Sequence, residues 1–176
     1  MAFNCNILLE DIDINCNKHS NVGGIKKAII MLQSDITIAF NPSDETEVVA
    51  VQTSNEKHFK HIQKDNTTSF SESKTTENGL GVVNTTITIQ IPSITRNLNK
   101  LDYFSRREDL VCVLLHNNES VTISGWLDGL CMNLNANSGS SITGKSVIDV
   151  ELYTESGMAS LVVNDKSFFA DQTIFD

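Results

Sequence analysis

The chain has 176 residues, 40% of them hydrophobic and 20% charged, which suits one domain whose core needs neither disulfides nor metals. Its formal net charge of −9, with only 13 Lys and Arg residues, argues against binding to nucleic acid or to an anionic membrane surface. The other polar residues are mainly Asn, Ser and Thr, and β-branched residues are abundant, so the composition favours strands over helices.

The N-terminal part predicts one short strand over Phe3–Leu9, followed by a polar loop from Asp11 to Gly24. The start lacks a basic segment followed by a long apolar one, so we expect no signal peptide. No apolar run approaches the roughly 20 residues that a membrane helix needs. We therefore expect a protein made in a cytosol and kept there, or in a particle assembled there.

Three apolar or alternating segments then predict three strands, over 25–32, 36–40 and 48–52. The second ends at Asn41-Pro42, which is a typical turn sequence. The mixed His, Lys and Phe residues within Lys57–Lys64 are interpreted as a solvated basic stretch.

A long hairpin is predicted around Asn78-Gly79, a dipeptide typical of tight hairpin turns. The segment before the turn, Thr67–Gly79, is polar. The segment after it, Val83–Ile91, alternates Ile with polar residues and is the clearest half-buried strand in the chain. We predict an extended hairpin over about 65–91. It is either a plain surface hairpin or an arm that reaches a neighbouring subunit.

One helix is predicted over about 93–105, with Ser93 as its N-cap. Ile94, Leu98 and Leu101 follow at spacings of four and three residues, so we expect this face of the helix to pack on a sheet.

The C-terminal half predicts a meander of strands over 110–115, 121–127, 130–134, 147–153 and 161–163. Asp128-Gly129 is expected to form a tight turn within it, and Asn135–Lys145 a Gly- and Ser-rich loop. The tail, Ser167–Asp176, carries aromatic residues without a clear period. We interpret about 165–176 as a C-terminal arm that packs on another subunit; the alternative is that the tail folds back on its own domain.

Together these elements predict a single, mainly β domain over 1–176 with one α-helix that lies across a sheet. The four cysteines are Cys5, Cys16, Cys112 and Cys131. Cys112 and Cys131 lie in apolar runs, which favours buried thiols over disulfides.

No complete catalytic, cofactor or metal site emerges. His58 and His61 are three residues apart, which suits a metal pair only on a helix, and no further ligand completes a zinc spacing. Asp11 and Asp13 lack the surroundings of a calcium-binding EF-hand loop. Neither a nucleophile elbow nor a phosphate-binding loop occurs. We predict that the protein is not an enzyme and carries no cofactor.

Three segments form a recognisable set. Cys16–Met31 has an early Cys, then Asn-Val-Gly-Gly-Ile and an apolar strand. Thr85–Leu115 joins an Ile-rich strand, the amphipathic helix and an apolar strand. Gly125–Gly144 contains Gly-x-x-x-Gly and the Ser/Gly/Thr-rich loop, before the alternating strand Val147–Tyr153. The set resembles small virion proteins of tailed phages of gut Bacteroidales, including the crAss-like phages, whereas Asn41–Gly79 matches nothing in that group.

The resemblance implies a tail-tube-like fold, a β-sandwich or partial barrel with one flanking α-helix at about 93–105. It also implies a ring subunit that lines or surrounds the DNA channel of a phage tail or head–tail connector. It implies partners of three kinds: about six or twelve copies of the chain in a closed ring, neighbouring tail, portal or connector proteins, and DNA that passes without specific binding during genome ejection. The location would be the virion, after assembly in the host cytoplasm, with no membrane partner. An acidic channel wall would repel DNA; the alternative use of the charge is solubility alone.

Two other functions stay open. One is a capsid decoration protein. The other is a carbohydrate-binding or adhesion module on a β-sandwich, with Trp126 and Tyr153 as ligand platforms. The mass of the protein in solution, with electron micrographs, separates these readings.

Overall fold

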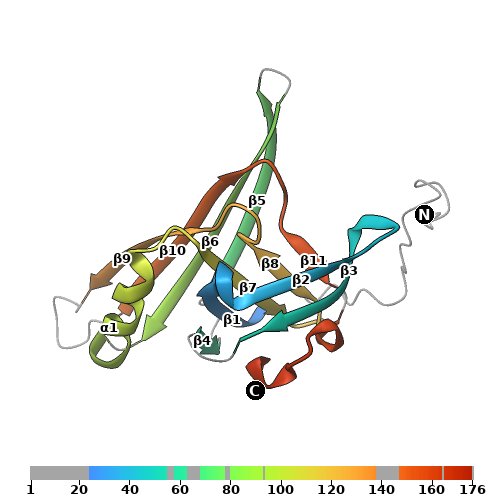
Figure 1. The fold of residues 1–176 in the computed structure, drawn as a ribbon. Helices are drawn as coiled ribbons and strands as arrows, with labels where there is room; N and C mark the ends of the chain where they lie inside the picture. The colour runs from blue at the N-terminus through green and yellow to red at the C-terminus, as the bar shows by residue number, and fades with distance from the viewer. Residues whose placement is uncertain are drawn as a thin grey trace, which may run out of the picture.

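The computed structural model describes residues 24–54, 58–62, 68–77, 80–92, 94–137, 147–163 and 165–175. The predictions for Phe3–Leu9, for the loop that starts at Asp11, and for Cys5 and Cys16 lie outside these residues. The chain is mainly β with one short α-helix, as its composition predicts (Figure 1).

The strands are β1 (Ile25–Leu32), β2 (Ile36–Asn41), β3 (Asp44–Thr53), β4 (His58–Ile62), β5 (Thr68–Glu77), β6 (Leu80–Pro92), β7 (Leu110–His116), β8 (Val121–Ser124), β9 (Cys131–Asn137), β10 (Val147–Ser156) and β11 (Leu161–Val163). The helix is α1 (Ile94–Ser105), and the short 3-10 turns are η2 (Gln33–Asp35), η3 (Lys166–Phe168) and η4 (Gln172–Phe175).

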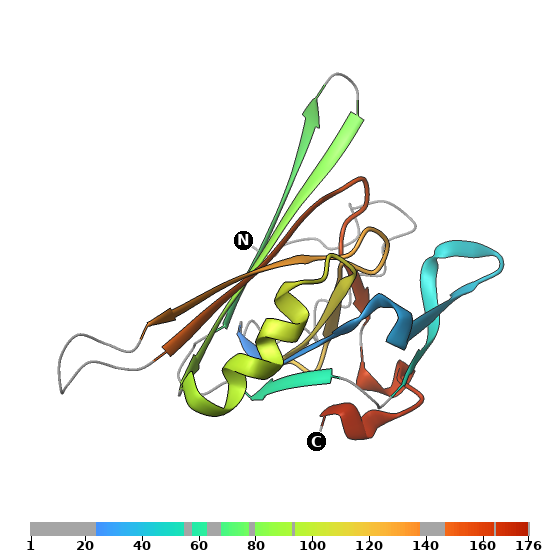
Figure 2. The same ribbon diagram turned by 60° about the vertical axis from the view of Figure 1, so that its left-hand side comes forward.

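The strands form three antiparallel sheets. The five-stranded sheet has the order β11-β8-β7-β1-β4, the four-stranded sheet the order β5-β6-β10-β9, and β2 pairs with β3 (Figures 1 and 2). Consecutive residues of β7 belong to two different cores: Cys112 and Leu114 to one, Val111, Val113 and Leu115 to the other. β7 is therefore buried on both faces, and so is β1 from Ala28 onward, which explains the apolar runs Leu110–Leu115 and Ala28–Leu32.

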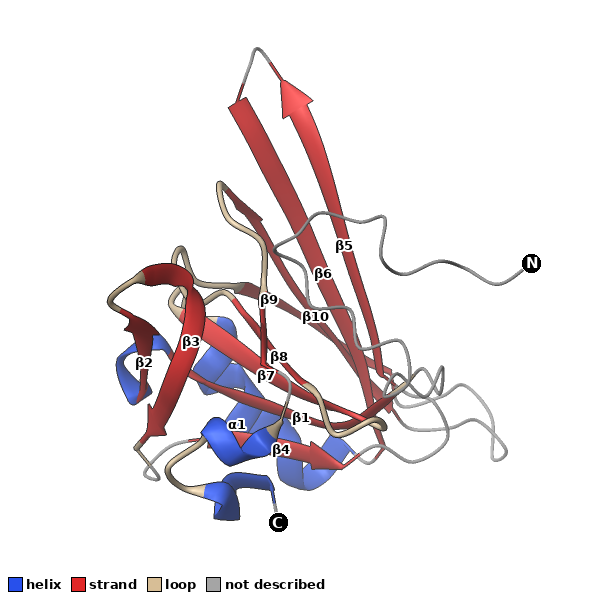
Figure 3. Cartoon of the chain, turned by 90° about the vertical axis from the view of Figure 1, so that its right-hand side faces the viewer, coloured by secondary structure: helices blue, strands red, loops and turns tan. Residues whose placement is uncertain are grey.

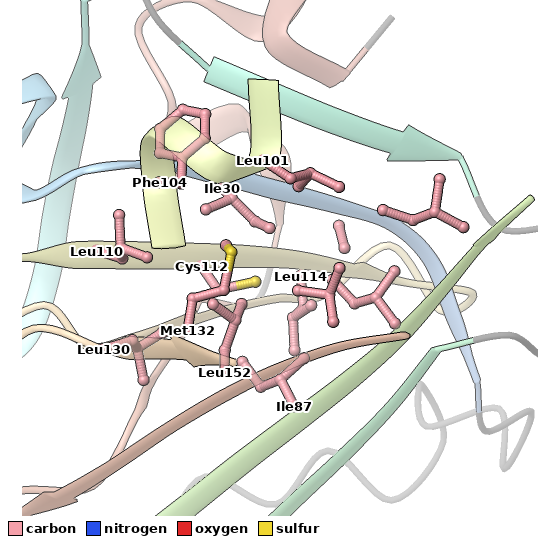
Figure 4. Close-up of a cluster of buried hydrophobic side chains, with 14 of the residues drawn as sticks. Ile30, Ile87, Leu101, Phe104, Leu110, Cys112, Leu114, Leu130, Met132 and Leu152 are labelled. Carbon is pink, nitrogen blue, oxygen red and sulfur yellow. The ribbon is translucent and has the colours of Figure 1, made fainter. Parts of the chain in front are cut away.

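The first core lies between the four-stranded sheet, the five-stranded sheet and α1 (Figure 4). Leu101 is fully buried in it and Leu98 is partly buried, so the predicted inward face of the helix is confirmed at these two positions. The predicted bounds of about 93–105 are confirmed as well. The side chain of Ile94 and the cap Ser93 lie outside the described residues.

The second core covers the opposite face of the five-stranded sheet with the β2–β3 ribbon and the C-terminal tail. Phe169, Ile174 and Phe175 are at most 4% exposed, and the rings of Phe169 and Phe175 meet edge to face at 4.9 Å. Ala170 N donates to Val51 O at 2.9 Å, which attaches the tail to β3. The described part of the tail thus folds back on its own domain, which is the alternative to the predicted C-terminal arm over about 165–176 that packs on another subunit. This sheet face needs an apolar cover, and the tail supplies part of it.

The predicted C-terminal meander is also wrong in its pairing. β7 and β8 do pair, but the next strand, β9, pairs with β10 in the other sheet, and β11 returns to β8. The chain changes sheet at 125–130, where Gly125 and Gly129 both adopt positive φ angles, of 76° and 77°. This left-handed backbone is what favours glycine at both positions.

A strand replaces part of the predicted solvated stretch Lys57–Lys64. β4 pairs with β1, with Phe59 opposite Ile30 and His61 opposite Ala28. His58 and His61 thus lie on a strand, where a spacing of three does not give the shared face that it gives on a helix.

Candidate interaction surface

The most prominent surface feature is the β5–β6 hairpin, which projects beyond the body of the protein (Figures 1 and 3). Its strands pair from Thr68 opposite Ile89 to Glu77 opposite Leu80, which confirms the predicted hairpin. The turn residues, Asn78 and Gly79, lie outside the described part of the chain. β10 pairs with β6 only as far as Ser156 opposite Val83. Residues 75–77 of β5 and 80–82 of β6 therefore extend past the sheet as two strands alone, and we call them the arm.

The four-stranded sheet has two edges that pair with no described strand, one along β5 and one along β9. The β5 edge is hydrophilic, because residues 71–76 are all polar or charged and all exposed. Phe70 on β5 and Leu134 on β9 sit at opposite margins of the first core and are each only partly buried. Each edge therefore combines a backbone that pairs with no described strand and an apolar side chain that is only partly buried.

The outer face of this sheet is polar. Alternation along β6 and β10 buries Ile87, Ile89, Ile91, Ile148, Val150 and Leu152 at 2% exposure or less. The residues between them face outward, and with their neighbours on β5 and β9 they are Ser69, Ser71, Ser73, Asn84, Thr86, Thr88, Gln90, Cys131, Asn133, Asn135, Asp149, Glu151, Tyr153 and Glu155. Three of these are acidic and none is Lys or Arg, so the described part of the face carries only negative charge.

A shallow groove of about 380 Å³ lies over this sheet, lined by Ser69, Thr88, Gln90, Asp149 and Glu151 among others. Ser69 and Thr88 hydrogen-bond each other through their hydroxyls, and Glu151 accepts from Asn133 Nδ2 at 3.2 Å. These groups are ordinary cross-strand pairs.

Two further titratable side chains, His116 and Cys112, lie on β7 within the body of the protein. His116 lies at the end of β7 with Nε2 at 2.8 Å from Thr122 Oγ1, and partial burial lowers the pKa of its imidazole. Burial raises the pKa of the Cys112 thiol well above its ordinary value, which makes it inert. The expected burial of Cys112 is confirmed, whereas Cys131 is only partly buried. Within the described ranges, no three His, Cys, Asp or Glu residues form a group that could hold a metal ion.

Trp126 and Tyr153, the two aromatic residues considered as ligand platforms, differ in exposure. The Trp126 ring packs against Phe40 at 5.6 Å between centroids, and its Nε1 donates to Ala159 O at 3.2 Å. Tyr153 is 41% exposed on the outer face of β10. Trp126 is thus held by contacts within the fold and is partly buried, whereas Tyr153 is exposed.

No protein-family model matches this chain, and no curated protein and no solved structure is similar enough to it to count as a match. None of the helices among the described residues is long and apolar enough to cross a membrane.

Proposed function

We propose that this protein is a structural virion subunit, which assembles with copies of itself into a closed ring in a phage tail or head–tail connector. The observation that carries the proposal is the four-stranded antiparallel sheet, whose two edges pair with no described strand and whose outer face is acidic.

The strand order makes the two edges complementary in direction. Neighbouring strands in β5-β6-β10-β9 are antiparallel, so β5 and β9 run in opposite directions. If β9 of one copy lies beside β5 of the next, the antiparallel alternation continues across the junction. An interface between two different edges is head-to-tail, and such an interface closes into a ring when its rotation divides the circle.

The side chains at the two edges fit this junction. Phe70 and Leu134 both face the first core and both remain partly uncovered at its margins. Bringing one copy's Phe70 toward the next copy's Leu134 would remove that apolar surface from water, at about 25 cal/mol per Å². On the outer face, Ser69 and Ser71 of one copy would then meet Asn135 and Asn133 of the next, and these side chains can hydrogen-bond each other.

In such a ring the outer faces of the four-stranded sheets form one continuous wall. Asp149, Glu151 and Glu155 give that wall negative charge without a described Lys or Arg to offset it. A wall of this kind repels phosphate groups, so DNA can slide past it without being held. The arm, residues 75–77 and 80–82, extends beyond the sheet and is available to reach a neighbouring copy.

Cross-linking through the native Cys131 tests the junction. Cys131 lies on β9 facing outward, and Ser69, Ser71 and Ser73 face outward on β5. Within one chain these edges are three strand spacings apart, about 14 Å, which is too far for a disulfide. We expect at least one of Ser69→Cys, Ser71→Cys and Ser73→Cys to form a ladder of covalent multimers under mild oxidation, in a background with Cys5→Ser and Cys16→Ser.

Two controls make the result specific. Adding Cys131→Ser must abolish the ladder, and Gln90→Cys, exposed on the interior strand β6, must not produce one. Non-reducing gels and sedimentation velocity give the readout. If all three β5 variants remain monomeric on oxidation, β5 and β9 do not form the junction.

A further inference from the structure

The connection between β10 and β11, residues 157–160, is bonded to both large sheets at the base of the arm. Ser160 N donates to Glu72 Oε2 on β5 at 2.9 Å, and the Ser160 hydroxyl lies 2.8 Å from that of Ser124 on β8. β5 belongs to the four-stranded sheet and β8 to the five-stranded sheet. One residue therefore joins the two sheets by hydrogen bonds at this point. Figure 1 shows the chain leaving β10 beside the hairpin before it descends to β11.

Glu72 accepts a second hydrogen bond at the same oxygen. The hydroxyl of Thr85, which is only 3% exposed, donates to Glu72 Oε2 at 3.2 Å from the neighbouring strand β6. Because a buried hydroxyl without a hydrogen-bond partner is destabilising, this bond from Thr85 holds the Glu72 carboxylate in place. On the other side of the connection, Trp126 Nε1 donates to Ala159 O. The connection is thus attached to β5 through Glu72, and to β8 and the segment after it through Ser124 and Trp126.

The position of this bridge along the hairpin gives it a mechanical role. The pair Glu72–Thr85 lies two residues before Lys74–Val83, the last hairpin pair that β10 also supports. Beyond Lys74–Val83 the arm consists of two strands alone, and an isolated two-stranded hairpin is marginally stable in water. The direction of the arm is therefore set at its base.

We propose that Glu72 is a positioning residue, which fixes the direction of the arm relative to the five-stranded sheet through its hydrogen bond to Ser160. The proposal rests on the proposed function, since the direction of the arm matters if the arm has to reach a neighbouring copy. It assigns a role to a carboxylate that is exposed to solvent and lies in no pocket with catalytic groups.

Amide hydrogen exchange and assembly, measured on the same variants of the full chain, test this role. In Glu72→Ala we expect the Ser160 amide to exchange at least about tenfold faster than in the wild type, because a charged acceptor is removed. We expect ring formation, followed by sedimentation velocity, to fall several-fold while the melting transition stays cooperative. Glu72→Gln retains a carbonyl oxygen that can accept both bonds, so it should restore much of both properties. Glu108→Ala, which removes an exposed carboxylate away from this sheet, should change neither.

The outcomes separate this proposal from the ring itself. Unchanged exchange at Ser160 in Glu72→Ala overturns the bridge, and so does a Glu72→Gln variant that behaves like Glu72→Ala while remaining folded. Full assembly of Glu72→Ala overturns the positioning role. A wild-type protein that never assembles counts against the ring, and exchange at Ser160 then still decides whether Glu72 holds the connection.

Discussion

A methyl group at Gly129 would meet the backbone where the chain changes sheet. A Cβ atom there would lie 2.2 Å from Glu108 O, and the φ angle of +77° disfavours any L side chain. Gly129 N donates to Gly125 O at 3.0 Å, so the two glycines close one turn. This turn carries the chain from β8 in one sheet to β9 in the other, and it accounts for the interrupted meander.

We therefore expect Gly129→Ala to destabilise the fold by about 1–3 kcal/mol from backbone strain alone. Gly157→Ala is the matched control, because its Cβ would have no atom within 4 Å. The control should stay within about 0.5 kcal/mol of the wild type. Urea denaturation of both variants measures the difference, and equal midpoints for the two would contradict the role of Gly129.

Buried and half-buried strands could be predicted because their side chains follow the environment of their two faces. β6 and β10 alternate, since one face meets the core and the other meets solvent, and their predicted alternation is confirmed by the burial of Ile89 and Val150. β1 is apolar from Ala28 to Leu32 because both of its faces are buried there. β4 was missed, because its sequence His-Phe-Lys-His-Ile has neither pattern.

Pairing between strands could not be predicted in the same way. Periodicity describes the two faces of a strand but says nothing about which sheet it joins, so β9 and β11 were assigned to the wrong neighbours. The candidate surface shares this limit. Thr88, Glu151 and Asn133 each stand at polar positions of alternating strands, but only the order β5-β6-β10-β9 places them side by side on one face.

The C-terminal tail is an element whose contribution can be measured directly. Phe169 is 2% exposed and packs among the side chains that cover the five-stranded sheet. We expect Phe169→Ala to cost about 3–5 kcal/mol, as truncations of buried Phe do. Gln172→Ala, an exposed position in η4, should change stability by less than about 0.5 kcal/mol. Thermal and urea denaturation supply both values.

Deleting Ser167–Asp176 should have a larger effect, because it uncovers the apolar face that Phe169, Ile174 and Phe175 protect. The truncated chain should lose its cooperative unfolding transition or aggregate. A truncated monomer that stays as stable as the full chain would show that the tail is dispensable to the fold.

At the scale of the whole molecule, three layers place the protein's features on different sides. The β2–β3 ribbon and the tail cover one face of the five-stranded sheet, and the four-stranded sheet with α1 covers the other. No described element covers the outer face of the four-stranded sheet, and both of its edges pair with no described strand. The negative charge of that face, rather than the net charge of −9 alone, is what the proposed ring would present to DNA.

Reversing charge on this face tests its relation to DNA. If the face lines a channel, the wild-type protein should not retard double-stranded DNA in a gel, whereas Glu151→Lys combined with Glu155→Lys should bind it. Both residues are exposed on β10 and face outward. In a ring the new lysines of all copies would surround one duplex, so the affinity should fall steeply as salt rises, because each phosphate contact releases a counterion.

Glu47→Lys combined with Glu108→Lys makes the same change in net charge at exposed positions away from this sheet. We expect that control to bind DNA more weakly and with a shallower salt dependence. Equal binding by the two double variants would mean that net charge alone governs the interaction, and that this face has no special relation to DNA.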